Sequence, residues 1–463
     1  MAGSAREALH SELAPMAVMM VALLLRLPIL TGGQIDYDEG VYWQSLRALM
    51  AGHHLFSEIY SSQPPGFLLV LLPFYGLLGQ NLIAARIGVL LFSLAGLLAA
   101  YRIGALLADR RVGLLAMAVL AADPIGVRES VALQADSPAI ALALWSVVLA
   151  LETRVAGRRA ALPAFLAGGL LALSVLVKPL AVAAGPPLLL ALLLSPAAGR
   201  DRLRGVALAA AGGIVASAAL LLPLHAEWGP MWDQTVGFHL VARGVSVGGL
   251  DLYTVKSELP IVALGLAGLA VCLRQAPRLA AVAGLWAASA ALILAVQRPL
   301  WPHHLLALSV PAALLAGGLA RFPALRSFDA RLAVVPAALL LAASLGAAAL
   351  VHQHQMSDAS LQPAVARLQA VTRPSDPIVT DDQYMAALAG RDTPPELVDT
   401  SMVRIASGDL TTPSIEAIAE RSGSHAFLFS TGRFLQLAGL ESWASAHYPR
   451  HVTLDSQRTL YLP

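Results

Sequence analysis

The sequence is poor in the residues that give soluble proteins their solubility and their covalent cross-links. Only 13% of the 463 residues are charged, and Cys272 is the single cysteine. One cysteine excludes a disulfide within the chain. The formal net charge of +2 leaves no basic patch or stripe for the phosphates of a nucleic acid. The composition therefore argues against both a disulfide-stabilised scaffold and a nucleic-acid partner.

Apolar residues dominate instead. They make up 57% of the chain, and the mean hydropathy is +0.69. Such values are far too high for an ordinary soluble domain and indicate a polytopic α-helical membrane protein. The first 30 residues resemble a signal sequence, but Arg26 interrupts the apolar run and no small-x-small cleavage site follows it. We therefore expect a retained first transmembrane span.

Eleven stretches come close to the length of about 20 apolar residues that a spanning helix needs. They cover residues 14–31, 82–107, 111–125, 133–151, 160–177, 179–195, 204–224, 257–274, 279–297, 303–320 and 331–350. A twelfth apolar stretch, 67–79, has only 13 residues. It is either a short span or a segment that lies in the membrane interface.

The distribution of basic residues decides between these two alternatives. If 67–79 does not cross, five loops with 38 residues and 13 arginines fall on one side, and loops with 81 residues and six lysines or arginines fall on the other. This asymmetry is the positive-inside pattern. We therefore predict 11 spans, a cytoplasmic N-terminus, and an extracytoplasmic first loop, residues 32–65.

The same topology places residues 351–463 outside the cytoplasm, as a soluble domain that follows a transmembrane domain of residues 1–350. Its composition is mixed and polar, and short β-rich runs at 377–380, 426–430, 451–454 and 459–462 alternate with helical stretches. Thr412 can cap a helix in which Pro413 takes the first position and Ile415, Ile418 and Ala419 form an apolar stripe. We predict a small α/β domain that acts as a lid or a docking module.

The first loop carries the most conspicuous polar cluster. Asp36, Asp38 and Glu39 follow the first span directly, and carboxylates are costly there unless they meet water, a cation or a substrate. The next residues, 40–52, have apolar residues on one helical face and predict a helix lying in the membrane interface. The acids would then lie at the start of this helix, at the depth of the lipid head groups.

Other ionisable residues fall on the same predicted side. They include Asp136, Arg128, Lys178, Arg298 and His303, and Arg26 lies about one turn inside the first span. Acidic residues beside a few basic residues at helix ends suit a site that holds an anionic lipid head group next to a carboxylate base. The histidines lack a convincing set of zinc ligands.

Several short motifs occur in a particular order on this side. Asp38-Glu39-Gly40-Val41-Tyr42 follows the first span, Pro64-Pro65-Gly66 comes about 25 residues later, Gly79 precedes Arg86, and Arg128 precedes Asp136. In order and spacing, residues 14–350 resemble the protein O-mannosyltransferases. More broadly, they are similar to the GT-C membrane glycosyltransferases, which include the lipid A aminoarabinose transferases.

This resemblance implies an inverting transfer of a monosaccharide from a polyprenyl-phosphate donor to a hydroxyl acceptor on the extracytoplasmic face. Asp38 would be the base that deprotonates the acceptor, and Glu39 and Asp136 would orient the acceptor or hold a divalent cation, which is the one possible cofactor. The donor phosphate would be bound by residues chosen from Arg26, Arg128, Lys178, Arg298 and His303. The acceptor could be a protein, a glycolipid or an envelope glycan, and the sugar a hexose or a pentose.

Two alternatives stay open at this point. A multi-span transporter or lipid-head-group flippase also has many spans and intramembrane charges, but transporters place charges near the midplane and often consist of two related halves. No convincing internal repeat is visible in the sequence.

Each candidate residue also has a structural explanation: Asp136 can cap a helix, Arg26 can extend its charge to the interface, and Lys178 before Pro179 can mark a helix boundary.

Overall fold

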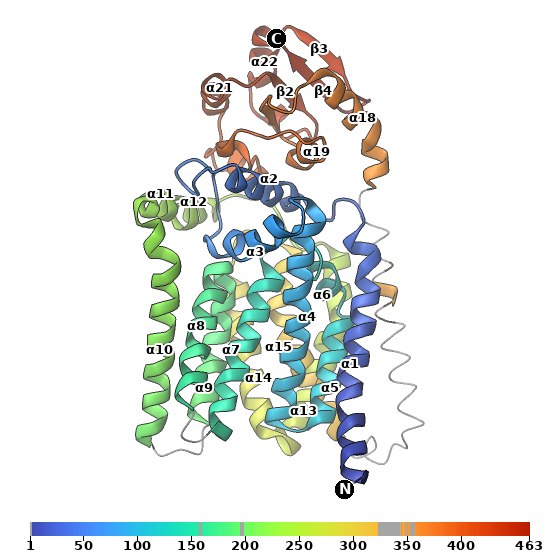
Figure 1. Ribbon diagram of the computed structural model, residues 1–463, viewed down its shortest axis with the longest axis vertical. Helices are drawn as coiled ribbons and strands as arrows, with labels where there is room; N and C mark the ends of the chain where they lie inside the picture. Colours follow the sequence, from blue (N-terminus) through green and yellow to red (C-terminus); the bar gives the residue numbers. More distant parts are fainter. Residues whose placement is uncertain are drawn as a thin grey trace.

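The computed structural model describes residues 2–156, 160–194, 199–322 and 357–463, together with residues 343, 345–347, 349 and 351. Long helices form a bundle, and a smaller domain with a β-sheet lies on one end of it (Figure 1). The N-terminus lies at the opposite end of the bundle (Figure 1). The bundle and the small domain correspond to the two parts predicted from composition.

The helices of the bundle are apolar along most of their length. They are α1 (Ala2–Leu30), α4 (Leu82–Leu107), α5 (Arg110–Ala122), α7 (Asp136–Ala156), α8 (Ala161–Val177), α9 (Gly185–Leu193), α10 (Gly199–Leu221), α13 (Leu252–Gln275), α14 (Pro277–Val296) and α15 (Leu306–Gly317). Short helices connect them at the domain end: α2 (Asp38–Met50), α3 (Gly66–Leu77), α6 (Pro124–Glu129), α11 (Trp228–Trp232) and α12 (Phe238–Ala242).

Seven helical stretches of the described chain are long and apolar enough to cross a membrane. Three other predicted spans are shorter helices: α5 has 13 residues, α8 has 17, and α9 is preceded by the 3-10 helix η2 (Pro179–Ala184). The predicted eleventh span, 331–350, lies almost entirely outside the described residues. The polytopic helical class is therefore confirmed, whereas the number of 11 stays a prediction.

The doubtful segment 67–79 forms α3, which has 12 residues. At a rise of about 1.5 Å per residue it extends about 18 Å, well short of the hydrocarbon core of a bilayer. In Figure 1, α3 lies across the end of the bundle, next to α2 and beneath the small domain. This placement agrees with the prediction that the segment does not cross.

Glycine residues set the closest helix contact in the bundle. A Cβ atom on Gly168 of α8 would lie 1.7 Å from the carbonyl oxygen of Ala209 on α10, and one on Gly212 would lie 1.8 Å from that of Phe165. Small residues allow membrane helices to approach closely where lipid supplies no hydrophobic driving force. Substitution of either glycine would push these two helices apart.

The small domain is an α/β unit. Its strands are β1 (Ile378–Thr380), β2 (Ala426–Phe429), β3 (Arg450–Thr453) and β4 (Thr459–Leu462), in the order β1-β2-β4-β3. Only the β1–β2 pair is parallel. Its helices are α18 (Asp358–Val371), α19 (Gln383–Leu388), α20 (Met402–Ala406), α21 (Thr412–Arg421) and α22 (Leu440–His447). All four strands lie where the β-rich runs were predicted.

Helix α21 differs from its prediction by one residue at its N-terminus. The side chain of Thr411, not of Thr412, accepts a hydrogen bond from the backbone N–H of Ser414. Extended backbone at Thr411 lets its hydroxyl reach the free N–H groups of the first turn. The predicted stripe is correct, because Ile415, Ile418 and Ala419 are all buried.

The domain is docked directly on α2. A Cβ atom on Gly40 would lie 2.5 Å from the backbone nitrogen of Tyr384 in α19, so only glycine permits this approach. The amide of Gln44 donates to the carbonyl oxygen of Arg391 at 3.0 Å, and Arg47 pairs with Asp392 at 2.6 Å. Helix α2 is therefore enclosed between the bundle and the domain, whereas we expected it to lie on the membrane surface.

Candidate active site

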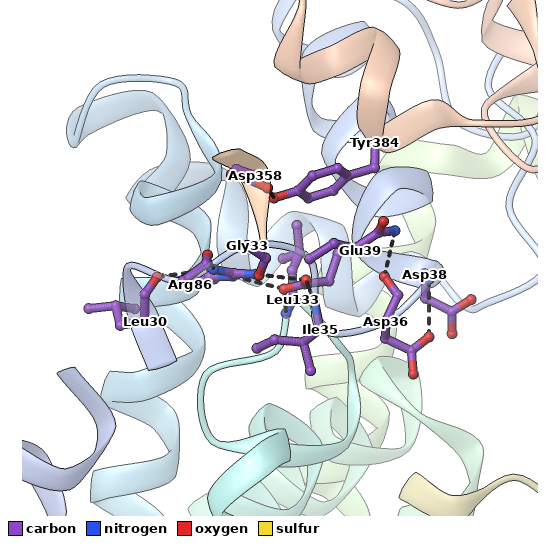
Figure 2. A network of polar contacts seen from close by, with 12 residues as sticks. Leu30, Gly33, Ile35, Asp36, Asp38, Glu39, Arg86, Leu133, Asp358 and Tyr384 are labelled. Atoms are coloured by element: carbon purple, nitrogen blue, oxygen red, sulfur yellow. Dashed lines mark hydrogen bonds and ion pairs between the residues drawn. The ribbon is translucent and has the colours of Figure 1, made fainter. Parts of the chain in front are cut away.

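Two neighbouring carboxylates begin helix α2. Asp38 and Glu39 occupy its first turn, where negative charge interacts favourably with the helix dipole. Consecutive residues of an α-helix point about 100° apart, so the two side chains leave the helix on different sides. Figure 2 shows Glu39 extending toward Arg86, whereas Asp36 and Asp38 extend the other way.

Glu39 is completely buried in an ion pair with Arg86 of α4. The Nε and Nη2 atoms of Arg86 donate to its two oxygens at 2.8 and 2.7 Å. The backbone nitrogens of Ile35 and Leu133 donate to the same carboxylate at 2.7 and 3.0 Å. Arg86 also donates to the carbonyl oxygen of Leu30, the last residue of α1, and to those of Gly32 and Gly33 in the loop that leads to α2.

This network fixes the loop that leads to Asp38. Both oxygens of Glu39 are occupied by the protein itself, so none is left to orient an acceptor or to hold a cation. The contacts of Glu39 are those of a structural residue, and the role that we expected for it stays a prediction. Nothing in the sequence predicted that Arg86, 47 positions away, would be its partner.

Asp38 has the opposite environment. Among the described residues, none makes a hydrogen bond or an ion pair with its carboxylate, and its backbone nitrogen donates to Oδ1 of Asp36 at 3.2 Å. Burial raises the pKa of Asp38 well above the usual value, and the nearby carboxylates of Asp36 and Asp399 raise it further. The Asp38 carboxylate lines a large cavity.

The cavity has a volume of about 880 Å³ and lies between the domain end of the bundle and the small domain. This volume falls in the range of pockets that hold small-molecule ligands. Side chains from the first loop, from the end of the bundle and from the segment Asp399–Val403 of the small domain line it. A site in this cavity therefore belongs to both parts of the chain.

Three of the five predicted phosphate ligands line this cavity: Lys178, Arg298 and His303. Lys178 lies at the break between α8 and η2, where its extended backbone ends one helix and Pro179 begins the next. Arg298 is exposed, and its Nη1 donates to the carbonyl oxygen of Gln297 at 2.6 Å. His303 is buried in the short helix that precedes α15.

The other two arginines are used within the protein. Arg26 is buried and donates to the hydroxyl of Ser130 at 2.7 Å and to two carbonyl oxygens. Arg128 pairs with Asp36 and, at 2.6 Å, with Glu129. Neither lines the large cavity. Arg26 fastens α1 to its neighbours, and Arg128 holds Asp36; the phosphate-binding role expected for both stays a prediction.

Asp136 also has a partner within the protein. Its Oδ2 accepts a hydrogen bond from Nζ of Lys178 at 2.5 Å, and both side chains are buried. Asp136 does not line the large cavity, but Lys178 does. Asp136 therefore orients the lysine, and its expected contact with acceptor or cation stays a prediction.

Comparisons with known proteins agree with this architecture. A family model described as dolichyl-phosphate-mannose-protein mannosyltransferase matches residues 62–224. The crystal structure of ArnT from Cupriavidus metallidurans, bound to undecaprenyl phosphate, is similar with a TM-score of 0.69 and 15% sequence identity, over 96% of this chain and 97% of that one. No curated protein matches the sequence.

Two more distant structures share the arrangement. The oligosaccharyltransferase of Archaeoglobus fulgidus in its apo form matches with a TM-score of 0.60 and 13% identity, over 93% of this chain and 71% of that one. The arabinofuranosyltransferase AftD from Mycobacteria matches with a TM-score of 0.54 and 16% identity, over 90% of this chain and 35% of that one. The chain has the GT-C glycosyltransferase fold. The predicted resemblance is thereby confirmed.

Within this GT-C fold, the residues do not form an evident metal site. Among the described residues, no three or more His, Cys, Asp or Glu side chains converge in a way that could hold a metal ion. His303 and His304 lie edge to face with their ring centroids 4.5 Å apart, but no carboxylate completes a set with them. The divalent cation stays a prediction, and no chemical step below depends on it.

Sequence reasoning missed several residues of the cavity. Asp399 and Arg433 come from the small domain, and Arg243 and His239 come from the connection between α10 and α13. The sequence around Asp399 contains no motif, and only docking of the domain brings this residue to the first loop. The docking contacts of Gly40 and Gln44, which lie on the same helix as Asp38, carry no recognisable sequence signal either.

Proposed function

We propose that this protein transfers a sugar from a polyprenyl-phosphate donor to a hydroxyl acceptor, with Asp38 as the catalytic base. The observation that carries the proposal is the Asp38 carboxylate, which has no partner among the described residues and lines a cavity that also contains Lys178, Arg298 and His303. The likeness to ArnT bound to undecaprenyl phosphate supports a polyprenyl phosphate as the lipid. No comparable observation favours a transporter or a flippase.

The expected chemistry needs only one carboxylate. Asp38 accepts the proton of the acceptor hydroxyl as its oxygen attacks the anomeric carbon, and the bond from that carbon to the phosphate oxygen breaks. The polyprenyl phosphate leaves as an anion, so it needs no strong general acid, unlike the leaving group of a glycosidase. A raised pKa suits this role, because a stronger base accepts the proton more readily.

Lys178 is suited to hold the leaving phosphate. An ammonium group has three N–H donors, and Asp136 accepts one of them at 2.5 Å. The ion pair fixes the direction of the side chain and leaves two donors for an anion in the cavity. Arg298 and His303 would add further donors to the phosphate.

The test uses the purified full-length protein in lipid nanodiscs and a panel of undecaprenyl-phosphate sugars that carry mannose, glucose, galactose or arabinose. Release of undecaprenyl phosphate is measured with and without simple glycoside acceptors. We expect the wild type to consume at least one donor and Asp38→Asn to be at least about 100-fold slower. Failure to consume any donor, or near-normal turnover by Asp38→Asn, contradicts the proposal.

The positive-inside pattern supports an extracytoplasmic position for this site. A single-cysteine protein tests it, because Cys272 is buried and can be replaced by alanine. We expect Glu420→Cys on the exposed surface of the small domain to react with a membrane-impermeant maleimide in intact cells. Asp201→Cys, in the exposed first turn of α10 at the other end, should react only after permeabilisation. The reverse result would invert the topology.

A further inference from the structure

The small domain reaches the cavity mainly through one segment, Asp399–Val403. Within it, Asp399, Ser401, Met402 and Val403 line the cavity wall. The segment follows the 3-10 helix η7 (Pro395–Leu397), and its last two residues, Met402 and Val403, begin α20. A module that only covered the bundle would not need to place a carboxylate in the cavity.

Contacts on both sides hold this segment in place. The backbone nitrogen of Thr400 donates to the hydroxyl of Tyr37 at 3.0 Å. Nη1 of Arg404 donates to the carbonyl oxygen of Asp399 at 2.5 Å. The guanidinium of Arg433 lies 3.7 Å from the centre of the Tyr37 ring, a cation–π contact. Since Tyr37 directly precedes Asp38, these contacts fix the segment relative to the proposed base.

The described residues provide few hydrogen bonds and no ion-pair partner to the buried carboxylate of Asp399. Only 8% of the residue is exposed, and among the described residues it forms no ion pair. The side chain of the nearby Arg404 is used by Asp409, at 2.6 Å, and by backbone carbonyls. One oxygen of Asp399 accepts from the backbone nitrogen of Ser401 at 2.8 Å, and the described residues provide no donor for the other. A buried carboxylate in this state favours a ligand that donates hydrogen bonds.

We propose that Asp399 recognises the sugar in the cavity, by accepting hydrogen bonds from its hydroxyl groups. Carboxylate oxygens are pure acceptors, and hydroxyls are the donors that every monosaccharide carries. Asp38 and Asp399 line the same cavity, so one acts on the reacting hydroxyl while the other binds hydroxyls that do not react. This inference rests on the proposed function. The sugar belongs either to the donor lipid or to a glycan acceptor.

The test compares Asp399→Asn with Asp376→Asn in full-length protein. Asparagine keeps an oxygen for the Ser401 nitrogen, so the fold should persist. Asp376→Asn makes the same change in a carboxylate of the same domain that lies outside the cavity lining and accepts from the backbone nitrogen of Arg373 at 2.8 Å. The probes are undecaprenyl phosphate alone, undecaprenyl-phosphate mannose and undecaprenyl-phosphate arabinose for the donor, and methyl α-mannoside and methyl α-arabinofuranoside for the acceptor.

We expect Asp399→Asn to bind undecaprenyl phosphate like the wild type. If the donor sugar is recognised, affinity for a sugar-bearing lipid falls about tenfold or more, as for the loss of a charge-assisted hydrogen bond. If the acceptor is recognised, donor affinity is unchanged and the KM for the glycoside rises by a similar factor. Asp376→Asn should change none of these values.

Three results overturn the inference while leaving the proposed function intact: unchanged sugar affinity and KM in Asp399→Asn, an equal loss for the lipid without sugar, or the same loss in Asp376→Asn. A wild-type protein whose sugar affinity is abolished by EDTA and restored by Mg²⁺ would show that a cation, not a sugar hydroxyl, meets the carboxylate. A wild type that consumes no sugar-bearing lipid overturns the proposed function itself.

Discussion

Asp38 and Glu39 are neighbours in the sequence, yet the surroundings of the two side chains differ in every respect. Glu39 is buried against Arg86 and receives four hydrogen bonds from the protein. Asp38 lines the cavity and has no partner for its carboxylate among the described residues. The comparison teaches that neighbouring acids can have separate surroundings: one carboxylate stabilises the loop, and the other lines the cavity without a partner among the described residues.

The largest expected effect is a loss of sugar-transfer rate on substitution of Asp38. Asp38→Asn should reduce sugar transfer about 100- to 10,000-fold, because a general base contributes a factor of this size. Its thermal unfolding in detergent should occur at the wild-type temperature or above, since the variant no longer buries a charge. Asp201→Asn is the control, because it makes the same change at an exposed site outside the cavity lining. A clear loss of stability in Asp38→Asn would place it with Glu39 as a structural residue.

The second effect is a loss of folding stability on substitution of Glu39 or its partner Arg86. Glu39→Gln or Arg86→Met leaves one charge of a fully buried pair without its partner, which should lower the free energy of unfolding by about 3–5 kcal/mol. The double variant Glu39→Gln/Arg86→Met should recover part of this loss. Thermal unfolding of the three variants measures the coupling between the two sites. If the double variant loses the sum of both single losses, the pair is not the stabilising contact inferred here.

A third variant tests whether Lys178 both pairs with Asp136 and binds the donor phosphate. Lys178→Met should weaken binding of undecaprenyl phosphate about 10- to 100-fold, through the loss of a charged hydrogen-bond donor, and should destabilise the fold because Asp136 stays buried and unpaired. Adding Asp136→Asn should restore stability but not affinity. Recovery of affinity in the double variant would show that Lys178 has no contact with the phosphate.

The smallest expected effect is a pH dependence. The pKa of Asp38 is raised, so the wild-type rate should increase with pH through a range above that of an ordinary aspartate. Because the pKa of Asp38 is higher in the folded state than in the unfolded state, the contribution of Asp38 to stability is greatest at low pH. This contribution is lost as pH rises through the folded-state pKa. Asp38→Asn should remove this contribution to the stability profile. A rate that already levels off at the pKa of a free aspartate would contradict a desolvated base.

Much of the architecture could be predicted because its physical causes are local. Long apolar stretches predicted the helical bundle, and a shift in composition predicted the α/β domain with all four strands in place. The distribution of basic residues was enough to predict that the short segment forming α3 does not cross. Asp38 could be selected because carboxylates directly after a transmembrane span are rare and costly.

The partners of the ionisable residues could not be predicted in the same way. Arg26 and Arg128 looked like phosphate ligands because they lie near the predicted outer face, but their donors are used within the protein. Asp399 was missed because its role depends on how the small domain docks on α2. A sequence shows which charges exist, whereas a fold decides which of them neutralise one another.

The sequence by itself determined the class of the protein, the order of its helices and the presence of a carboxylate cluster at one end. These features follow from hydropathy and charge, which each segment carries on its own. Only the tertiary structure decided which carboxylate is free, because buried charges must find partners and those partners come from distant helices. The cavity, too, exists only where the bundle and the docked domain meet.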